Sequence, residues 1–178
     1  LDGMAVFLNR RMVGTMNEDE CRGFRWLKPG RLSGGLIVIP SPLNKDKLVT
    51  LELTRSLTTV TPVIKNNSLK MVIRIEAEGN YYEQNCTGNI LTLGNIPKLE
   101  ALANQEIARQ VDSCISKAQS CQSDVLGWGR MVQAQDPFLW EKLADDWPAV
   151  FSALPYDIKA EFSLRRSYLT DQSFVFRE

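Results

Sequence analysis

The chain has 178 residues, of which 44% are hydrophobic and 24% are charged, a composition typical of a globular domain with one substantial core. Basic and acidic side chains both number 21, so no basic excess favours nucleic acid as a partner. The sequence contains no histidine, which excludes Ser-His-Asp and Cys-His catalysis and histidine-ligated zinc. Any catalysis would have to rest on carboxylates, lysine, tyrosine or cysteine.

The first half of the chain is predicted to be rich in strands. Short apolar runs or alternating apolar and polar residues predict strands at residues 4–8, 12–16, 36–39, 47–54, 54–64, 69–78 and 81–83. The runs at 4–8 and 36–39 are wholly apolar, so these two strands are expected to be covered on both faces. Asn17 and Glu20 have the spacing of a capping box, which predicts a helix to about Leu27, before Lys28-Pro29-Gly30. A turn is expected at Asn66-Asn67-Ser68.

The second half is predicted to be mainly helical. Apolar residues at steps of three and four predict a long amphipathic helix over residues 98–120. Asp124 is expected to cap a short helix through Val132, and Asp136-Pro137 to begin another that Pro148 breaks or kinks. Residues 156–164 alternate again and predict a last strand.

These elements predict an α+β fold. Because several strands alternate, we expect a mainly antiparallel sheet with one solvated face and helices packed on the other. The chain shows no internal repeat and no low-complexity linker, so residues 1–178 are predicted to form a single α+β domain. A strand that begins almost at the first residue suggests a piece of a longer precursor.

The four cysteines are Cys21, Cys86, Cys114 and Cys121. On a continuous helix Cys114 and Cys121 lie roughly 10 Å apart, too far for a disulfide. A bridge between Cys21 and Cys86 stays open at this point. Buried free thiols are the favoured interpretation.

The stretch from 117 to 151 holds three of the four tryptophans, at the join between two predicted helices. Its Gly127-Trp128-Gly129 step is not a dinucleotide fingerprint, because no strand precedes it and position 132 is valine. An aromatic ligand cage is an alternative, but packing in the core is favoured. We expect the glycines to permit a close backbone turn, and we predict a partner contact at Asp124, Gly127, Trp128 and Gly129.

Ordered blocks of residues along the chain resemble a known family. They begin with Leu1-Asp2-Gly3-Met4-Ala5-Val6-Phe7 and continue through Gly35-Leu36-Ile37-Val38-Ile39-Pro40-Ser41-Pro42-Leu43. They are most specific at Lys117-Ala118-Gln119, Ser123-Asp124-Val125-Leu126-Gly127-Trp128-Gly129 and Pro137-Phe138-Leu139-Trp140, and they end at Leu164-Arg165-Arg166-Ser167. The chain is similar to the C-terminal domain of the Ger(x)C, or GerAC-like, family, although phenylalanine is often expected where Trp128 stands.

The resemblance implies the lipoprotein C subunit of a bacterial spore nutrient germinant receptor. It implies a lipid anchor on an N-terminal cysteine outside this sequence, at the outer face of the spore inner membrane, and two integral membrane partners, the A and B subunits. The family carries no catalytic residues that can be assigned here, so a non-enzyme without cofactor or metal is expected.

Two functional interpretations follow from the resemblance, and a third competes with them. The first is a module for receptor assembly or signalling during germination. The second is a domain that binds the nutrient directly, in an aromatic pocket. An enzyme that uses cysteine or carboxylates is the third and least supported.

Overall fold

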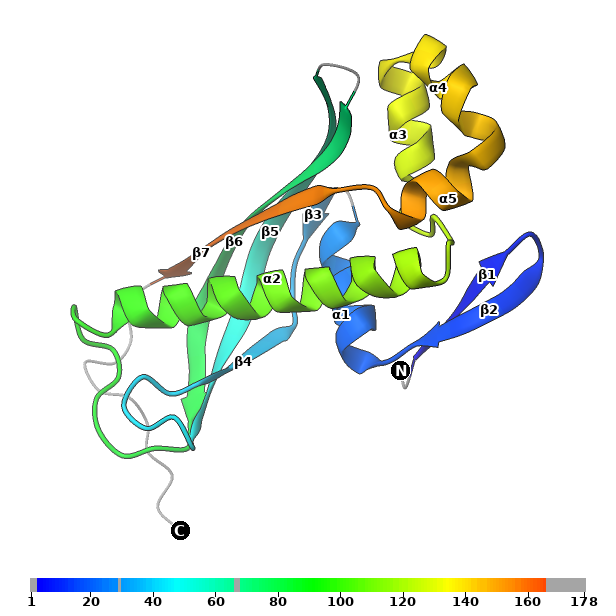
Figure 1. Cartoon of the computed structure of the whole chain (residues 1–178). Coiled ribbons are helices and arrows are strands. Elements are labelled where there is room, and N and C mark those ends of the chain that lie inside the picture. Colours follow the sequence, from blue (N-terminus) through cyan, green and yellow to red (C-terminus); the bar gives the residue numbers. More distant parts are fainter. Residues whose placement is uncertain (1–2, 29, 66–67, 166–178) are drawn as a thin grey trace. The chain divides into compact units, whose positions relative to one another are not determined.

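The computed structural model describes residues 3–28, 30–65 and 68–165 (Figure 1). The elements, in chain order, are β1 (Met4–Leu8), β2 (Arg11–Met16), α1 (Glu18–Leu27), β3 (Gly30–Leu32), β4 (Leu36–Pro40), β5 (Leu48–Lys65), β6 (Ser68–Gln84), α2 (Ile96–Ser120), α3 (Trp128–Gln135), α4 (Pro137–Leu143), the 3-10 turn η1 (Ala144–Asp146), α5 (Trp147–Ser152) and β7 (Tyr156–Arg165). The predicted turn at Asn66–Asn67, the helix stop at Pro29 and the last matching residues, Arg166 and Ser167, lie outside the described residues.

The chain divides into two compact units, each assembled from three separate segments. Unit 1 comprises Leu1–Pro29, Thr58–Arg74 and Arg109–Lys159. Unit 2 comprises Gly30–Leu57, Ile75–Ala108 and Ala160–Glu178. A single domain over residues 1–178 therefore stays a prediction.

The main sheet has five strands, in the order β3-β5-β6-β7, with β4 also paired to β5. Strand β4 pairs antiparallel with β5, with Ile39 opposite Val49. The Thr54 hydroxyl donates to the Glu78 carbonyl oxygen, and the Thr50 hydroxyl donates to the Glu83 carboxylate. Since the β6 partner advances as the β5 residue number falls, β5 and β6 are antiparallel.

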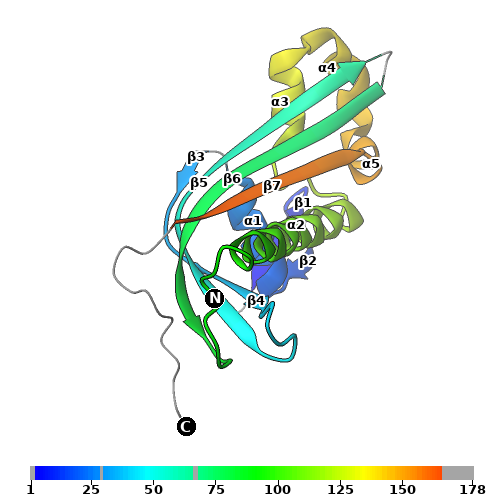
Figure 2. The ribbon, with the colours of Figure 1, turned by 90° about the vertical axis from the view of Figure 1, so that its left-hand side faces the viewer.

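Strand β7 is the exception to the antiparallel pattern. Lys70 pairs with Asp157 in unit 1, and Arg165 pairs with Glu78 in unit 2. Both residue numbers rise together, so β7 runs parallel to β6. Within unit 2, Figure 2 shows the first half of α2 along one face of the strands. The predicted α+β fold, mainly antiparallel with helices on one face, is confirmed.

Helix α1 begins at the capping box that the sequence predicts. The Asn17 backbone N–H donates to Glu20 Oε2 at 2.7 Å, and the Glu20 N–H donates to Asn17 Oδ1 at 3.0 Å. Two otherwise unpaired amides of the first turn are thus satisfied reciprocally.

Helix α1 packs directly on the second half of α2 within unit 1. A Cβ at Gly23 would lie 2.0 Å from the Gln110 carbonyl oxygen, so the two backbones approach at a distance that glycine alone permits. The indole N–H of Trp26 donates to Gln110 Oε1 at 2.9 Å, and the Thr58 hydroxyl donates to the Trp26 carbonyl at 2.7 Å. Polar groups inside this contact are therefore paired with each other.

In unit 2, the first half of α2 satisfies amides of β7. The Phe162 N–H donates to Asn104 Oδ1 at 2.6 Å, and the Leu164 N–H donates to Glu100 Oε1 at 2.9 Å. Side chains of a helix thus occupy hydrogen-bonding positions that an edge strand otherwise leaves open.

Strand β6 runs without a break through a segment for which the sequence predicts two strands. A Cβ at Gly79 would lie 2.6 Å from Cζ of Phe162. The glycine therefore makes room for the buried Phe162 ring and does not end the strand, which continues to Gln84.

Two strands predicted to be covered on both faces are half exposed. In β1 only Val6 is buried. In β4 Ile37 and Ile39 are buried, whereas Leu36 and Val38 are exposed. An apolar run shows that a strand is possible, but which faces are covered depends on its neighbours: β1 pairs only with β2, and β4 only with β5, among the described strands.

The four cysteines are free thiols, so no bridge joins Cys21 to Cys86. Burial raises the pKa of the Cys114 thiol to about 12. The favoured interpretation of buried free thiols holds for Cys86 and Cys114, while Cys21 and Cys121 are half-buried.

Tyr81 offers a test of the packing in unit 2. Its hydroxyl is buried and has no hydrogen-bond partner among the described residues, and burial raises the pKa of Tyr81 to about 12. We expect Tyr81→Phe to raise the free energy of unfolding by about 1 kcal/mol, because an unsatisfied hydroxyl is removed. Because the folded state keeps the Tyr81 phenol neutral, the free energy of unfolding falls above pH ~10, where the phenol of the unfolded chain ionises. Tyr81→Phe should not show this loss of stability at alkaline pH.

Urea titration at pH 7 and pH 10.5 measures both effects. Tyr156→Phe is the matched control, because the Tyr156 hydroxyl donates to Asp112 Oδ1 at 2.7 Å, and its removal is expected to destabilise. A loss of more than about 1 kcal/mol in Tyr81→Phe at pH 7 would mean that the hydroxyl has a partner in solution.

Candidate functional site

The predicted site lies at the joint between α2 and α3, which we define as residues 121–127, and at the first two residues of α3, Trp128 and Gly129, within unit 1. Helix α2 ends in a Schellman-type turn, in which the Gln122 N–H donates to the Gln119 carbonyl and the Ser123 N–H donates to the Ala118 carbonyl. Gln122 takes the left-handed conformation, with φ +51°, that this motif requires. Gly127, with φ +72°, is the second left-handed residue and directly precedes α3.

Asp124 is the polar centre of the joint. Its Oδ1 accepts a hydrogen bond from the Trp128 backbone N–H at 2.9 Å. Its Oδ2 accepts from the Gly129 N–H at 2.7 Å and from the indole Nε1–H of Trp147 at 2.9 Å. One carboxylate therefore caps the positive end of α3 and also holds α5 against it.

Trp128 is a large apolar side chain that is fully buried in unit 1. Its side chain is 1% exposed, and its ring lies 5.6 Å from the Phe151 ring in an edge-on contact. The Tyr156 ring lies 6.2 Å away on another side. These distances are typical of favourable aromatic pairs in cores. The first role of Trp128 is therefore to pack α3 against α5 and the start of β7.

Gly129 is buried because two indoles occupy the space of a side chain. A Cβ at this position would lie 2.9 Å from both Cη2 of Trp140 and Nε1 of Trp147. The Trp140 and Trp147 rings are themselves 5.1 Å apart. Figure 1 shows α3, α4 and α5 gathered into one group. Core packing, the favoured interpretation of the tryptophans, holds for Trp128 and Trp147, while Trp140 is half-buried.

Two more residues connect the joint to other parts of unit 1. Gln119 Nε2 donates to the carbonyl oxygens of Phe151 at 3.0 Å and Leu154 at 2.8 Å, and so caps the end of α5. The buried Ser123 hydroxyl donates to the Phe7 carbonyl in β1 at 2.6 Å. Both residues stand inside the sequence blocks that carry the family resemblance, which was the available signal for their importance.

The four predicted site residues are thus brought together, but with unequal access to a partner. Trp128 and Gly129 are buried, and the Asp124 carboxylate is bonded to three internal donors. Beyond Gly127 and its chain neighbours, no atom of a described residue lies within 4 Å of a Cβ built at this position, which therefore faces open space. Direct contact with a partner therefore stays a prediction, centred on Gly127.

The most exposed large apolar side chain near this site belongs to α4. Phe138 is 79% exposed, and no residue of α4 is buried. The helix is nevertheless well defined, because Asp136 Oδ1 accepts from the Leu139 N–H at 2.9 Å and Pro137 stands in the first turn. An aromatic residue presented on a capped helix is a typical contact residue of protein interfaces.

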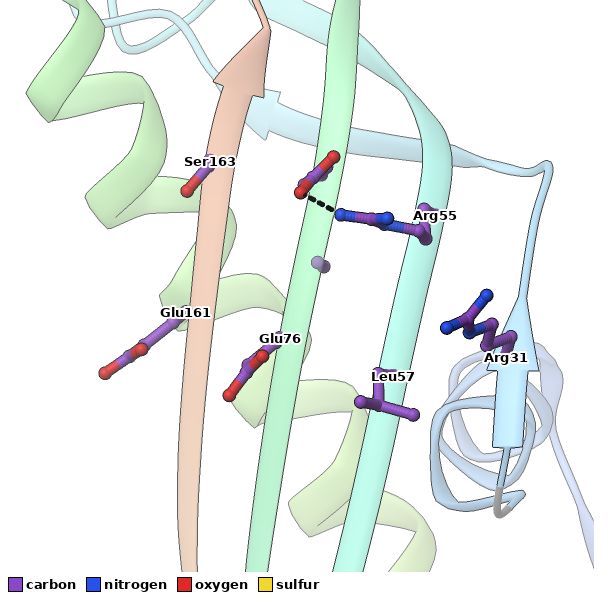
Figure 3. Close-up of a pocket in the computed structure, with 8 residues that line it drawn as sticks. Arg31, Arg55, Leu57, Glu76, Glu161 and Ser163 are labelled. Atoms are coloured by element: carbon purple, nitrogen blue, oxygen red, sulfur yellow. Dashed lines mark hydrogen bonds and ion pairs between the residues drawn. The ribbon is translucent and has the colours of Figure 1, made fainter.

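Unit 2 holds a shallow pocket on the sheet face (Figure 3). It has a volume of about 390 Å³ and is lined by charged side chains of both signs, with no aromatic residue: Arg31, Arg55, Leu57, Glu76, Ala77, Glu78, Glu161 and Ser163. Arg55 and Arg165 both bind Glu78, and the Arg55 hydrogen bond in particular lowers the pKa of that carboxyl. Arg31 makes no ion pair with a described residue.

Membrane spans and metal clusters are both absent from the part of the chain that the structure describes. None of its helices is long and apolar enough to cross a membrane. Its cysteine, aspartate and glutamate side chains form no group of three or more that is placed to hold a metal ion.

Comparison with known proteins gives a consistent family match. A family model described as "Spore germination B3/ GerAC like, C-terminal" matches residues 2–168. In Bacillus subtilis (strain 168), the chain is 26% identical over 145 residues to spore germination protein YndF, 25% over 158 residues to spore germination protein B3, and 25% over 170 residues to spore germination protein KC. These alignments cover 81%, 88% and 94% of this chain but only 35%, 41% and 41% of the relatives.

A solved structure shares the fold. The crystal structure of the GerBC protein matches with a TM-score of 0.79 at 21% identity, over 93% of this chain and 51% of that chain. The chain therefore spans about half of the matched structure and less than half of the curated relatives.

Proposed function

Because the chain belongs to the family of C-terminal domains of GerAC-like spore germination proteins, we propose that it is the C-terminal part of the C subunit of a nutrient germinant receptor. In this proposal the whole subunit is a lipoprotein at the outer face of the spore inner membrane. It acts together with the integral membrane A and B subunits. The domain is non-catalytic and serves receptor assembly or signalling.

The group of helices α3 to α5 supports the assembly role. The Asp124 carboxylate accepts three hydrogen bonds within this group, and the Trp128 side chain is buried in it. These contacts hold the helices together as one body. The same body presents Phe138, 79% exposed, on a helix with no buried residue. We assign Asp124, Trp128 and Gly129 the role of positioning α4. Phe138, together with the open surface at Gly127, is proposed to meet the membrane subunits.

Phe138→Ser tests this assignment. We expect the variant to reduce co-purification with the A and B subunits at least tenfold, because exposed aromatic anchors typically account for more than about 1.4 kcal/mol of an interface. The free energy of unfolding of the domain should change by less than about 0.5 kcal/mol, since the side chain is exposed. Germination in response to nutrient should fall in parallel.

Leu93→Ser is the matched control. Leu93 is 77% exposed, like Phe138, but lies in the loop before α2 in unit 2. It should leave co-purification and germination unchanged. Equal loss in both variants, or no loss in Phe138→Ser, would contradict the assignment of α4. Normal co-purification with failed germination in Phe138→Ser would favour signalling over assembly.

The pocket of unit 2 favours a second candidate function, direct nutrient binding. Its lining offers the guanidinium of Arg31 to a carboxylate, and Glu76 offers an acceptor to an ammonium or hydroxyl group. The absence of aromatic residues from this lining means that the binding site would be polar, unlike the aromatic pocket expected from the sequence. A thermal-shift screen against amino acids and sugars decides, since a ligand of the folded state raises its stability by mass action. Saturable stabilisation that Arg31→Ala abolishes would favour nutrient binding.

A further inference from the structure

The hairpin of β1 and β2 carries an exposed apolar patch next to its turn. Phe7 is 55% exposed and Met12 is 56% exposed, and the two residues are direct cross-strand partners. Val13, at the adjacent irregularity in register, is also exposed. On the opposite face Val6 and Met16 are buried, while Met4, Leu8 and Gly14 are half-buried. The hairpin therefore has one face packed within unit 1 and one apolar face left in solvent.

The turn of the same hairpin is basic. Asn9 and Arg10 both have positive φ, 48° and 66°, as in a type I′ turn. Arg10 therefore lies in the turn, and Arg11 follows it as the first residue of β2; we call these two residues the hairpin tip. Both arginines are exposed, and neither makes an ion pair with a described residue. Residues 3–16 contain no acidic side chain, so the tip has a net charge of +2 beside its apolar patch.

The hairpin is held firmly at the level of this patch. The Ser123 hydroxyl donates to the carbonyl of Phe7, and a Cβ at Gly14 would lie 2.8 Å from the Cys121 sulfur. The strand backbones thus rest on the joint between α2 and α3. A hairpin fixed in this way can present its outer face without a further entropy cost for ordering it.

We propose that this hairpin tip docks on an anionic lipid surface. The guanidinium groups of Arg10 and Arg11 pair with lipid phosphates, while their apolar stems and the side chains of Phe7 and Met12 enter the headgroup–acyl boundary. Charge complementarity favours this occupant, since both arginines beside the patch make no ion pair with a described residue and residues 3–16 carry no acidic side chain. Each arginine near such a surface strengthens binding about fivefold.

Two arginines and a few apolar side chains give weak binding, so this contact is a second attachment that orients a chain already held near the membrane. The proposal concerns this chain's own contact with lipid. It stands whether or not the domain meets other receptor subunits through α4.

Vesicle flotation of the 178-residue chain tests the proposal. The vesicles contain either equal phosphatidylglycerol and phosphatidylcholine or phosphatidylcholine alone. We expect binding to the anionic vesicles only, and weaker binding as salt is raised. The neutral variant Arg10→Gln/Arg11→Gln should lower the partition coefficient about 25-fold, at about fivefold for each arginine, and the double variant Arg10→Glu/Arg11→Glu should lower it further. Separately, Phe7→Ser/Met12→Ser should lower it severalfold.

Lys45→Glu/Lys47→Glu is the matched charge control, because both lysines are exposed in unit 2 and the net charge changes by the same amount. It should bind as the unmodified chain does, and circular dichroism melts of all variants confirm folding. The proposal is overturned if the unmodified chain does not bind anionic vesicles, or if the lysine control loses as much binding as the arginine variant. It is equally overturned if the hairpin variants keep lipid binding and instead lose the A and B subunits, which would make the occupant a protein.

Discussion

Replacing Asp124 with alanine is expected to lower the free energy of unfolding by about 4 kcal/mol. The substitution removes the acceptor of three hydrogen bonds at once, from the backbone amides of Trp128 and Gly129 and from the indole of Trp147. Because Trp128, Gly129 and Trp147 are buried, water cannot readily replace the lost carboxylate. Each buried donor left unpaired costs about 1–3 kcal/mol. Chemical denaturation, followed by tryptophan fluorescence, measures the effect.

Two further variants at capping positions calibrate this value. Asp136→Ala removes a carboxylate that accepts one hydrogen bond, from the Leu139 N–H, and should cost about 1 kcal/mol. Asp124→Asn keeps one acceptor oxygen and should cost about 2 kcal/mol. If Asp124→Ala costs no more than Asp136→Ala, the three hydrogen bonds do not act together as proposed, and Asp124 is an ordinary helix cap.

Gly23→Ala is the second substitution expected to have a large effect. A Cβ there would lie 2.0 Å from the Gln110 carbonyl oxygen, 2.7 Å from the Gln110 carbonyl carbon and 2.7 Å from Cβ of Cys114. Backbone atoms of α2 cannot move aside without shifting the helix, so α1 and α2 must separate. We expect a loss of about 3 kcal/mol, from overpacking and from strain on the Trp26–Gln110 hydrogen bond.

The sign of this effect is informative. In an exposed helix, alanine is more favourable than glycine by about 1 kcal/mol, so without the close approach of the two helices the variant should be stabilised. Gly94→Ala is the control, because a Cβ at this position would meet no atom of the described residues within 4 Å beyond its chain neighbours. It should change stability by less than about 0.5 kcal/mol. A stabilised Gly23→Ala variant would show that α1 and α2 are not in contact at this point.

Local signals in the sequence predict the elements well. The capping box at Asn17 and Glu20 and the first-turn proline at Pro137 determine helix starts through contacts within one turn, and both are present. The resemblance to the GerAC-like family is confirmed by the match over residues 2–168. A helix start that depends on contacts within one turn, and a family match that rests on many ordered blocks, can therefore be predicted from the sequence alone.

Features set by distant neighbours are not predictable in the same way. The parallel pairing of β7 depends on where the chain returns after α5, and no residue of β7 encodes that direction. The exposure of Leu36 and Val38 depends on which strands lie beside β4. Gly23 has no local reason to be glycine, and only the approach of Gln110 explains it.

In the candidate site, too, local features are predictable and contacts with distant residues are not. Its four residues are close in sequence, so their proximity is predictable, and the favoured core role of the tryptophans follows from their spacing. The side chains that each of these residues contacts are not predictable, since Asp124 accepts a hydrogen bond from Trp147, 23 positions away in the sequence. For this reason the sequence points to a partner contact at Asp124 and Trp128, while the exposed aromatic residue of helices α3 to α5 is Phe138 on α4.

We propose that the joint between α2 and α3 holds α4 in place as a surface for the membrane subunits of the receptor. Hydrogen–deuterium exchange of this chain, with and without the detergent-solubilised A and B subunits, tests it most directly. We expect slower exchange in Pro137–Leu143 and around Gly127, with no change at the strands that line the unit 2 pocket. Slower exchange at that pocket with unchanged α4, or no change anywhere, would contradict the claim.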